Sequence, residues 1–287
     1  MRRGLNLKAF LADKLEPKEL KSLYKSYDII GDIAVIRVPE TVKQKRDIIA
    51  EAVIQTHKHV RAVLCQFGPV SGDFRLRNLE WVAGERKTQT IHREHGCVFK
   101  VDLEKCYFSP RLSHERMRIA QHVRPGEVVV NMFAGVGCFS IIVAKHSEAE
   151  RIYSVDLNPV AIHYMRENIL LNRVEGTVVA VHGDARKAIE KNLREIADRV
   201  LIPLPEKAYE YLDCALLALK PTGGWIHYYS FEHAKKDEGP VGTTKDKVTK
   251  RLRDMEIRFE VPFGRIVRAT GPRWYQTVLD IRILPNL

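Results

Sequence analysis

The 287-residue chain lacks the features of a membrane or secreted protein. No apolar run approaches the roughly 18–20 residues that cross a bilayer, so we expect no membrane association. The start of the chain is broken by charged residues and makes a poor signal peptide. The five cysteines include no Cys-x-x-Cys pair, which argues against a disulfide framework and a zinc ribbon. These absences predict a cytoplasmic protein.

The chain is also poor in acidic residues relative to basic ones. It has 47 Lys and Arg against 36 Asp and Glu, a formal net charge of +11. Such an excess suits a nucleic acid, an acidic ligand or solubility alone, and composition does not choose among them. With 45% hydrophobic residues the chain is not disordered, and its length suggests about two domains.

The first part of the chain, residues 1–104, reads as a small α+β domain. Its apolar spacing predicts a helical lead-in, a helix and several short strands, and the glycine- and arginine-containing stretch 68–77 reads as a loop. The expected elements are helices at 1–27 and 43–57, two short strands within 27–39, and strands at 60–66, 78–84, 88–94 and 97–103.

The second part, residues 105–287, has a different pattern of predicted elements. Strands alternate with helices, which predicts right-handed βαβ units and a Rossmann-like, doubly wound α/β sheet. We expect strands at 127–133, 151–157, 177–185, 198–205, 223–231 and 276–284, with a late helix at 245–255. Residues 235–247 read as a mobile loop, and residues 268–274 as a loop before the last strand.

Three ligand-binding signals stand at the ends of successive strands of this part. Gly135 and Gly137 follow the first strand, Asp156 ends the second and Asp184 ends the third. Glycines allow close approach of backbone to a ligand, and a carboxylate at the second strand can accept hydrogen bonds from a ribose diol. The alternative is structural: the glycines would serve helix–strand packing, and Asp156 would cap the helix near Pro159.

The choice of cofactor follows from what this site lacks. The third glycine of a dinucleotide fingerprint is replaced by Ser140, and no second nucleotide-binding half is present. Together with the acidic strand ends, this favours S-adenosylmethionine over a dinucleotide.

Six segments carry a resemblance that covers nearly the whole chain from about residue 25. They are YFSPRLSHER (107–116), NMFAGVGCFSI (131–141), SVDLNP (154–159), RENILLN (166–172), HGDAR (182–186) and GGWIHYY (223–229). In this order they resemble the archaeal/eukaryotic-type tRNA guanine N1-methyltransferases, which modify the guanosine at tRNA position 37. A sister family, the wybutosine-pathway 3-amino-3-carboxypropyl transferases, shares fold and cofactor. The Pro-Arg of SPRL and the DLNP motif place this chain with the methyltransferases.

The resemblance implies a cofactor, a partner and a set of site residues. The cofactor is S-adenosylmethionine, the partner is the anticodon arm of tRNA, and we expect a monomer. The implied cofactor-binding residues are Tyr107, Phe133, Ala134, Gly135, Gly137, Asp156, Leu157, Asp184, Ala185 and Pro203.

Methylation at guanine N1 requires removal of its proton and stabilisation of charge on O6. Glu115 resembles the family's general base, and Arg111 lies one helical turn before it. Arg75 resembles the family's second arginine. The structural alternative is that Glu115 is an ordinary acid in the first turn of a helix that begins with Ser109-Pro110.

Further basic residues are candidates for RNA contact. These are Arg77, Arg268 and Arg273, with Trp274 beside them for stacking on a base. The alternative is a solvated loop with a buried tryptophan. No carboxylate or thiol spacing completes the local histidine clusters, so we expect no metal.

Two departures from the family keep other functions open. Pro203 stands where family methyltransferases usually have Asn, and Asn131 replaces the usual Asp before the glycine turn. The first alternative is an aminocarboxypropyl transferase acting on the same tRNA position. The second is a non-catalytic RNA-binding protein with a decayed cofactor pocket.

Overall fold

The computed structural model describes residues 7–24, 26–235 and 239–285. Two compact units divide the chain, Met1–Pro110 and Arg111–Leu287. The sequence placed this division at residue 104; the structure moves it because Phe108 packs in the first unit. Its ring lies 5.1 Å from that of His92, and its carbonyl accepts a hydrogen bond from Arg77 Nη2 at 2.8 Å. Within the described ranges, none of the helices has the length and apolar character of a membrane span.

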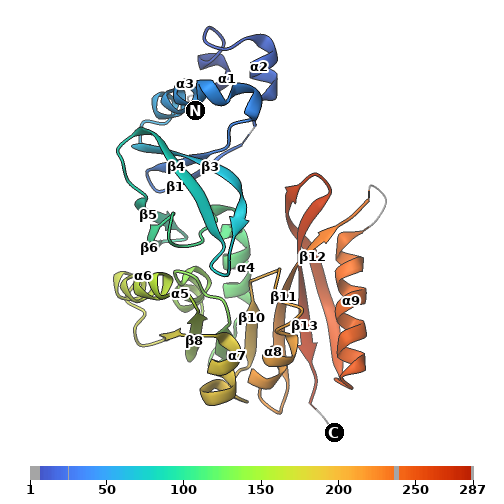
Figure 1. Ribbon diagram of the computed structural model, residues 1–287. Helices are drawn as coiled ribbons and strands as arrows, with labels where there is room; N and C mark the ends of the chain where they lie inside the picture. The colour runs from blue at the N-terminus through green and yellow to red at the C-terminus, as the bar shows by residue number, and fades with distance from the viewer. Residues whose placement is uncertain (1–6, 25, 236–238, 286–287) are drawn as a thin grey trace. The chain divides into compact units, whose positions relative to one another are not determined.

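The first unit is an α+β fold, as expected (Figure 1). A four-stranded sheet has the order β1-β2-β3-β4, in which β2 and β3 are parallel, and β5 and β6 pair separately. The apolar face of α3 packs on this sheet through Ile49 and Val53, which are buried. The elements are α1 (Leu7–Phe10), α2 (Pro17–Ser22), β1 (Asp28–Ile30), β2 (Ile33–Ile36), α3 (Arg46–Thr56), β3 (Ala62–Ser71), β4 (Leu76–Gly84), β5 (Gln89–Glu94) and β6 (Cys97–Asp102).

The expected loop at 68–77 is mostly strand. β3 continues to Ser71, with an irregular register between Phe67 and Ser71, and β4 begins at Leu76. Only residues 72–75 form the turn, in which Gly72 and Arg75 both have positive φ. The glycines indicated a loop, but this stretch pairs as strand, and the irregular register between Phe67 and Ser71 accommodates it.

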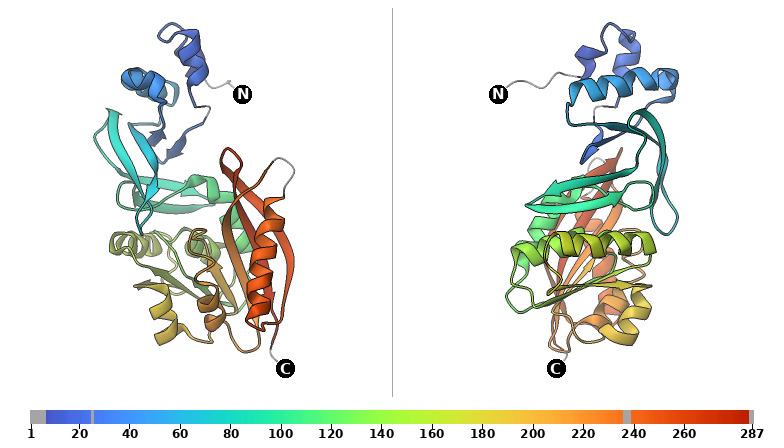
Figure 2. Two further views of the ribbon diagram at one scale, coloured as in Figure 1. Left: turned by 45° about the vertical axis from the view of Figure 1, so that its right-hand side comes forward. Right: turned by 90° about the vertical axis from the view of Figure 1, so that its left-hand side faces the viewer.

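The second unit is a doubly wound α/β domain with the strand order β12-β13-β11-β10-β7-β8-β9 (Figures 1 and 2). The five strands from β11 to β9 are parallel, and β13 and β12 are antiparallel additions at one edge. The strands are β7 (Val128–Asn131), β8 (Arg151–Asp156), β9 (Val178–His182), β10 (Arg199–Ile202), β11 (Gly224–His233), β12 (Phe259–Gly271) and β13 (Trp274–Ile283). The helices are α4 (Ser113–His122), α5 (Cys138–His146), α6 (Pro159–Leu171), α7 (Ala185–Ala188), α8 (Leu212–Ala218) and α9 (Pro240–Asp254).

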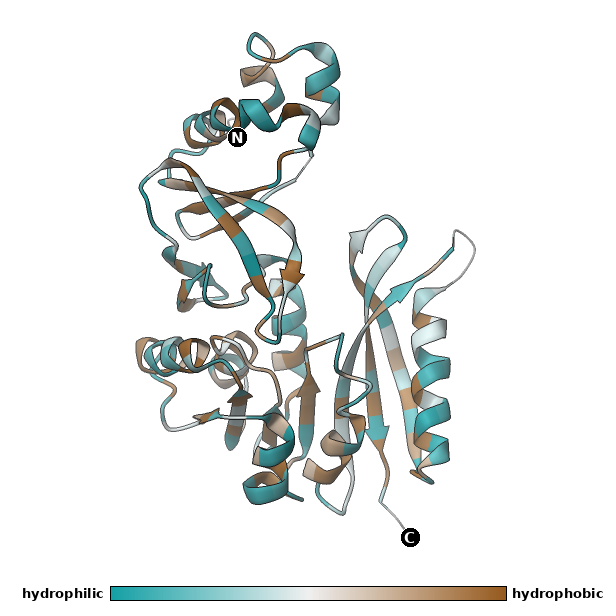
Figure 3. Cartoon of the chain, in the orientation of Figure 1, coloured by the Kyte–Doolittle hydropathy of each residue, from teal (hydrophilic) through white to brown (hydrophobic). Residues whose placement is uncertain are grey.

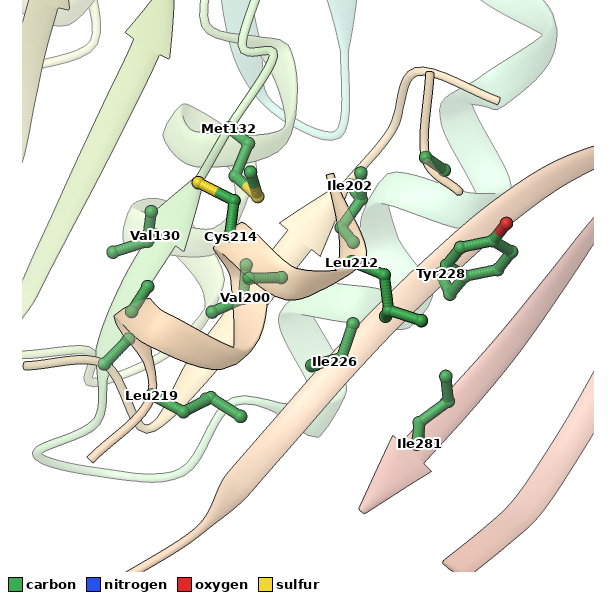
Figure 4. Packing of buried hydrophobic residues seen from close by; sticks show 14 of the residues in the cluster. Val130, Met132, Val200, Ile202, Leu212, Cys214, Leu219, Ile226, Tyr228 and Ile281 are labelled. Carbon is green, nitrogen blue, oxygen red and sulfur yellow. The ribbon is translucent and has the colours of Figure 1, made fainter. Parts of the chain in front are cut away.

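Helices cover both faces of this sheet, which is why its central strands are rich in apolar residues on both sides. On β11, Tyr228 packs in a cluster with residues of α8 and α9, while its neighbour Tyr229 contacts Phe139 of α5. Successive strand residues point to opposite faces, so α5 lies opposite α8 and α9. Hydrophobic residues follow the strands in Figure 3. Figure 4 shows Leu212 and Cys214 of α8 over the strand residues of that cluster.

β12 was not predicted from the sequence. None of its residues is fully buried, since it is the edge strand, and it therefore lacks the alternation that reveals a half-buried strand. Residues 268–274 accordingly belong to a β-hairpin with β13, not to a free loop.

The expected mobile loop at 235–247 was also wrong in its second half. α9 begins at Pro240, where proline is tolerated because the first turn needs no backbone donor. Residues 236–238 of that prediction lie outside the described residues.

Candidate active site

The turn between β7 and α5 is built on two glycines in left-handed backbone conformations. Gly135 has φ 57° and Gly137 has φ 91°. A Cβ atom on Gly137 would lie 2.9 Å from Met165 Cγ and 3.1 Å from Ile141 Cδ1. Gly137 is therefore required for packing, as the structural alternative held. Gly135 contributes its backbone amide, which donates a 2.6 Å hydrogen bond to Asp156 Oδ2.

Asn131 and Ser140, two residues that depart from the usual motifs, belong to a buried hydrogen-bond network next to this turn. Asn131 Nδ2 donates to Ser140 Oγ at 3.1 Å, and Ser154 Oγ lies 2.6 Å from the same oxygen. All three residues are fully buried. Ser140, which replaces the third glycine, thus ties the start of α5 to β7 and β8.

Asp156 at the end of β8 links the turn to the next helix. Its Oδ1 accepts the Asn158 amide at 2.9 Å, and Asn158 itself caps α6. Asp156 is therefore not the helix cap. Burial raises the pKa of Asp156, while the amides of Asn158 and Gly135 act in the opposite direction. A carboxylate has about four acceptor positions, so two remain for a diol.

Asp184 occupies the corresponding place after β9. It caps α7 by accepting the Lys187 amide, and its Oδ2 accepts the Tyr211 hydroxyl at 2.8 Å. Burial and the hydrogen bond to Asp184 raise the pKa of Tyr211 to about 12. Tyr211 also meets Phe133 edge to face, with ring centroids 5.0 Å apart. The sequence did not single out Tyr211, because it lies far along the chain in an ordinary helical stretch.

The remaining cofactor candidates of this unit also follow the strand ends. Ala134 and Ala185 are buried, Leu157 is 46% exposed, and Pro203 directly follows β10. The carboxyl ends of β7 to β10 form one edge of the sheet, where doubly wound folds bind ligands. The acceptors, the left-handed turn and the apolar walls fit a cofactor with an adenosine group.

We expect Gly137→Ala to destabilise the protein by about 2–4 kcal/mol, because a left-handed alanine and an overfilled site each cost free energy. Chemical denaturation measures this change. The matched control is Gly242→Ala in α9, where a Cβ meets nothing within 4 Å. Alanine is favoured over glycine inside a helix by about 0.5–1 kcal/mol, so this control is expected to stabilise. Equal effects of the two substitutions would contradict the role of Gly137.

Glu115 lies in the first turn of α4 and is 1% exposed. Its Oε1 accepts hydrogen bonds from Arg118 Nη2 at 2.7 Å and from the Tyr229 hydroxyl at 2.8 Å. Its Oε2 accepts from Arg265 Nη2. Burial would raise the pKa of Glu115, but Arg118, Arg265 and Tyr229 together hold it below its usual range. Glu115 is therefore a buried, ionised carboxylate, more than an ordinary acid at a helix start.

The carboxylate belongs to a longer buried network. Arg118 Nη1 donates to Asp280 Oδ2 at 2.6 Å, and His227 Nδ1 lies 2.6 Å from Asp280 Oδ1. Arg199 Nη1 lies 2.6 Å from His227 Nε2. Arginine can only donate, so Nε2 is the acceptor and neutral His227 carries its proton on Nδ1. Burial lowers the pKa of His227, which agrees with the neutral form.

Three predicted residues lie in the first unit. The Arg75 guanidinium stacks 4.3 Å from the Tyr107 ring centroid. Arg77 does not agree with its predicted role in RNA contact. It is 9% exposed, and Nη2 donates to Asp28 and to the carbonyl of Phe108. Arg77 is a structural residue.

The other basic candidates belong to the second unit. Arg111 is exposed in a 3₁₀ turn, Pro110–Leu112, that precedes α4. Arg273 is exposed at the tip of the β12–β13 hairpin with φ 61°, and Trp274 beside it is 47% exposed. The alternative of a buried tryptophan is therefore wrong. Arg268 Nε donates to Gln276 Oε1 across the hairpin at 2.8 Å.

The described part of the chain contains no group of three or more His, Cys, Asp or Glu arranged to hold a metal. The chemistry available at the site is that of an ionised carboxylate, arginines and a nucleotide-binding strand edge. The fold and this site define a Rossmann-like methyltransferase class.

Two family models account for most of the chain. Residues 90–258 match the TRM5/TYW2 methyltransferase domain, and residues 7–88 match the TYW2 N-terminal domain. The chain belongs to the TRM5/TYW2 methyltransferase family.

Three relatives illustrate the range of this family. Trm5b of Pyrococcus abyssi, a tRNA (guanine(37)-N(1))-methyltransferase, is 42% identical over 93% of this chain and 78% of its own length. Its crystal structure superimposes with a TM-score of 0.86, covering 99% of this chain and 82% of that one. Taw21 of Saccharolobus solfataricus, a tRNA 4-demethylwyosine(37)-methyltransferase, is 36% identical over 92% of this chain and 96% of its own. Pyrococcus horikoshii TYW2, solved in complex with MeSAdo, is 27% identical with a TM-score of 0.79, covering 98% of both chains.

Proposed function

We propose that this protein transfers a methyl group from S-adenosylmethionine to N1 of guanosine 37 in the anticodon arm of tRNA. The observation that carries the proposal is Glu115, a buried carboxylate kept ionised by two arginines. The family membership and the 42% identity to a tRNA (guanine(37)-N(1))-methyltransferase support it. We place the reaction in the cytoplasm and expect the protein to act as a monomer.

Different residues of the second unit bind the cofactor and act on the base. Asp156 holds the ribose hydroxyls, Asp184 accepts from the adenine amino group, and the backbone at Gly135 lies against the cofactor. S-adenosylmethionine, when bound, supplies an electrophilic methyl group. Glu115 removes the proton from guanine N1, and arginine charge stabilises O6. Arg111, and Arg75 of the first unit, are the arginines that the family resemblance supplies for this task.

The surface of the β12–β13 hairpin supports the choice of RNA as partner. Exposed Arg273 and Trp274 stand together at its tip, and Arg268 lies on the same hairpin. An arginine beside an exposed aromatic ring suits stacking on a base. With a net charge of +11, binding to a polyanion is expected to weaken as salt is raised.

The test is mass spectrometry of tRNA nucleosides after incubation with protein and S-adenosylmethionine. The proposal requires N1-methylguanosine at position 37 and release of S-adenosylhomocysteine. Release of methylthioadenosine would identify an aminocarboxypropyl transferase instead. Failure to bind S-adenosylmethionine in a calorimetric titration would leave a non-catalytic RNA-binding protein.

A second candidate is methylation of a wyosine precursor at the same position. Its supporting observation is Pro203 at the end of β10, where the amide of the family Asn is absent. The 36% identity to a 4-demethylwyosine methyltransferase agrees with it. The same assay decides between them when tRNA carrying guanosine or 4-demethylwyosine at position 37 is offered separately.

We expect Asp156→Ala to weaken S-adenosylmethionine binding at least ~10-fold. The substitution removes two charge-assisted acceptors for the cofactor, each worth about 1.5–3 kcal/mol, and it frees the Gly135 amide. Calorimetry measures the dissociation constant. Asp246→Ala on the exposed side of α9 is the control and should bind as the wild type does. Unchanged affinity of the Asp156 variant would remove the ribose assignment.

A further inference from the structure

A cavity of about 720 Å³ opens on the first unit, between the strand β5 and the turn that joins β1 to β2. β1 contacts β5 in this unit (Figure 1). Gly31 in the turn has φ 57°, and a Cβ atom on it would overlap Thr90 Oγ1 and the carbonyl oxygen of Ile91. The turn therefore rests directly on β5, and the two segments form the walls of a cavity large enough for a small ligand. The reaction proposed above uses none of the residues that line it.

The acidic group in the cavity is already paired. Asp32 Oδ1 accepts the Thr90 hydroxyl at 2.7 Å, and Asp32 Oδ2 accepts from Lys87 Nζ at 2.6 Å. Burial would raise the pKa of Asp32, but Lys87 and Thr90 hold it below its usual value, so the carboxyl is ionised. Lys87 also pairs with Glu85 at 2.8 Å. Asp32 is therefore not available to bind a cation, and most of the charge of Lys87 is compensated within the protein.

The exposed face of β5 carries the groups that are not paired. Gln89, Ile91 and Arg93 are exposed and alternate with less exposed residues, so their side chains share one face of the strand. Ile91 is 51% exposed. The side chains of Gln89 and Arg93 have no hydrogen-bond or ion-pair partner among the residues that the structure describes. The cavity therefore presents an amide, an apolar side chain and a guanidinium in a row.

The charges that line the cavity decide which ligand it suits. With the histidines counted as neutral, Asp32 and Lys87 cancel, and Arg93 leaves one positive charge. One phosphodiester group, with a single negative charge, matches this better than a phosphomonoester with a charge of about −1.5 to −2. The exposed imidazole of His59 adds a ring on which a base can stack. An anion joined to a flat ring is the chemistry of a nucleotide within an RNA strand.

We propose that this cavity binds one unpaired nucleotide of the tRNA substrate, with its base against Ile91 and its phosphodiester on Arg93. Residues two apart in a strand are separated by about 7 Å, so one nucleotide can reach both side chains. Gln89 lies on the other side of Ile91 along the strand, where its amide can bind the polar edge of the base. The inference rests on the proposed function, from which it takes tRNA as the partner, and it adds a binding site in the first unit.

The test compares the tRNA affinity of the wild type with those of Arg93→Gln and Ile91→Thr. Fluorescence anisotropy of labelled tRNA is measured over a range of salt concentrations. We expect Arg93→Gln to weaken binding about 10-fold and to lower the slope of log affinity against log salt by about 0.7, the value for one phosphate contact of a single strand. Ile91→Thr keeps the β-branched shape and the charge of β5, so it should weaken binding about 5-fold and leave the slope unchanged.

The matched control is Arg37→Gln, which removes an exposed arginine of the same unit outside the cavity. This variant should bind tRNA as the wild type does. Equal losses of affinity in Arg93→Gln and Arg37→Gln would show only a diffuse attraction between the protein and RNA, and the inference would be wrong. Wild-type affinity and slope in both cavity variants, with normal methylation, would overturn the inference alone. Absence of N1-methylguanosine with the wild type would instead overturn the proposed function.

A second titration separates an RNA strand from a free nucleotide. Adenosine 5′-monophosphate is titrated calorimetrically into wild type and Arg93→Gln, with S-adenosylhomocysteine filling the cofactor site. We expect the free nucleotide to bind much more weakly than tRNA, because a phosphomonoester brings more negative charge than the cavity compensates. Binding of the free nucleotide that needs Arg93, together with unchanged tRNA affinity in Arg93→Gln, would make the free nucleotide the ligand and overturn the assignment to RNA.

Discussion

Replacing Glu115 by Gln is expected to lower the single-turnover rate of methyl transfer to tRNA at least ~10²-fold, the low end for loss of a general base. The amide has nearly the shape of the carboxylate and can still accept from Tyr229 and Arg118, but it cannot take a proton from guanine N1. Affinities for S-adenosylmethionine and tRNA should stay close to wild type, because the amide keeps the volume of the carboxylate and can keep the hydrogen bonds from Arg118 and Tyr229. A rapid-quench assay with protein in excess over tRNA measures the rate.

The pH dependence sharpens this prediction. The pKa of Glu115 is below the usual value of about 4.3, so the base is already ionised at any pH above about 5. A fall of the wild-type rate with acid near neutral pH would therefore have to come from another group. Glu260→Gln, an exposed glutamate paired with Arg282, is the matched control and should keep the full rate. A Glu115→Gln protein as fast as wild type would remove Glu115 from the mechanism.

The sequence predicted the parts of the fold that follow from local patterning. Parallel strands buried on both faces are largely apolar, so β7 to β11 were predicted at nearly the right residues. β12 was not found, because an exposed edge strand has neither such a run nor strict alternation. The start of α9 was missed for a related reason, since a glycine and a proline at its first residues look like loop.

The candidate site divides in the same way. The cofactor candidates stand directly after strands, and order along the chain is enough to bring strand ends together. The partners of Glu115 come from far away: Tyr229 is 114 residues distant, and Arg265 is 150. Only Arg118, three residues on along the same helix, carried a local signal. The prediction of RNA contact for Arg77 was wrong, because a basic residue near a turn is usually accessible, whereas this side chain is buried.

Arg118 is the residue whose loss should damage the fold most. It bridges two buried carboxylates, Glu115 and Asp280, and its own side chain is 14% exposed. Burial lowers the pKa of Arg118, but its hydrogen bonds to the two carboxylates raise it well above its usual value. Burial likewise opposes ionisation of Asp280, yet His227 and Arg118 lower the pKa of this carboxyl. Arg118, Glu115 and Asp280 are therefore all charged, and each depends on the other two.

Arg118→Met keeps much of the side-chain volume and removes the bridging charge, so we expect a loss of about 3–5 kcal/mol in the free energy of unfolding. Depressed carboxyl pKa values add stability above the unfolded values, near 4, and that stability is lost as pH falls through the folded values. The variant lacks most of this contribution and is therefore less stable than the wild type. The difference in the free energy of unfolding should narrow as pH is lowered from about 8 toward 5, because the carboxylates left without Arg118 begin to take up protons in this range. Urea denaturation at several pH values measures both effects. Arg282→Met removes an exposed ion pair on the same sheet and should cost less than about 1 kcal/mol at every pH. A deficit of that small size in the Arg118 variant, or one that does not change with pH, would show that the buried carboxylates do not depend on Arg118 for their charge.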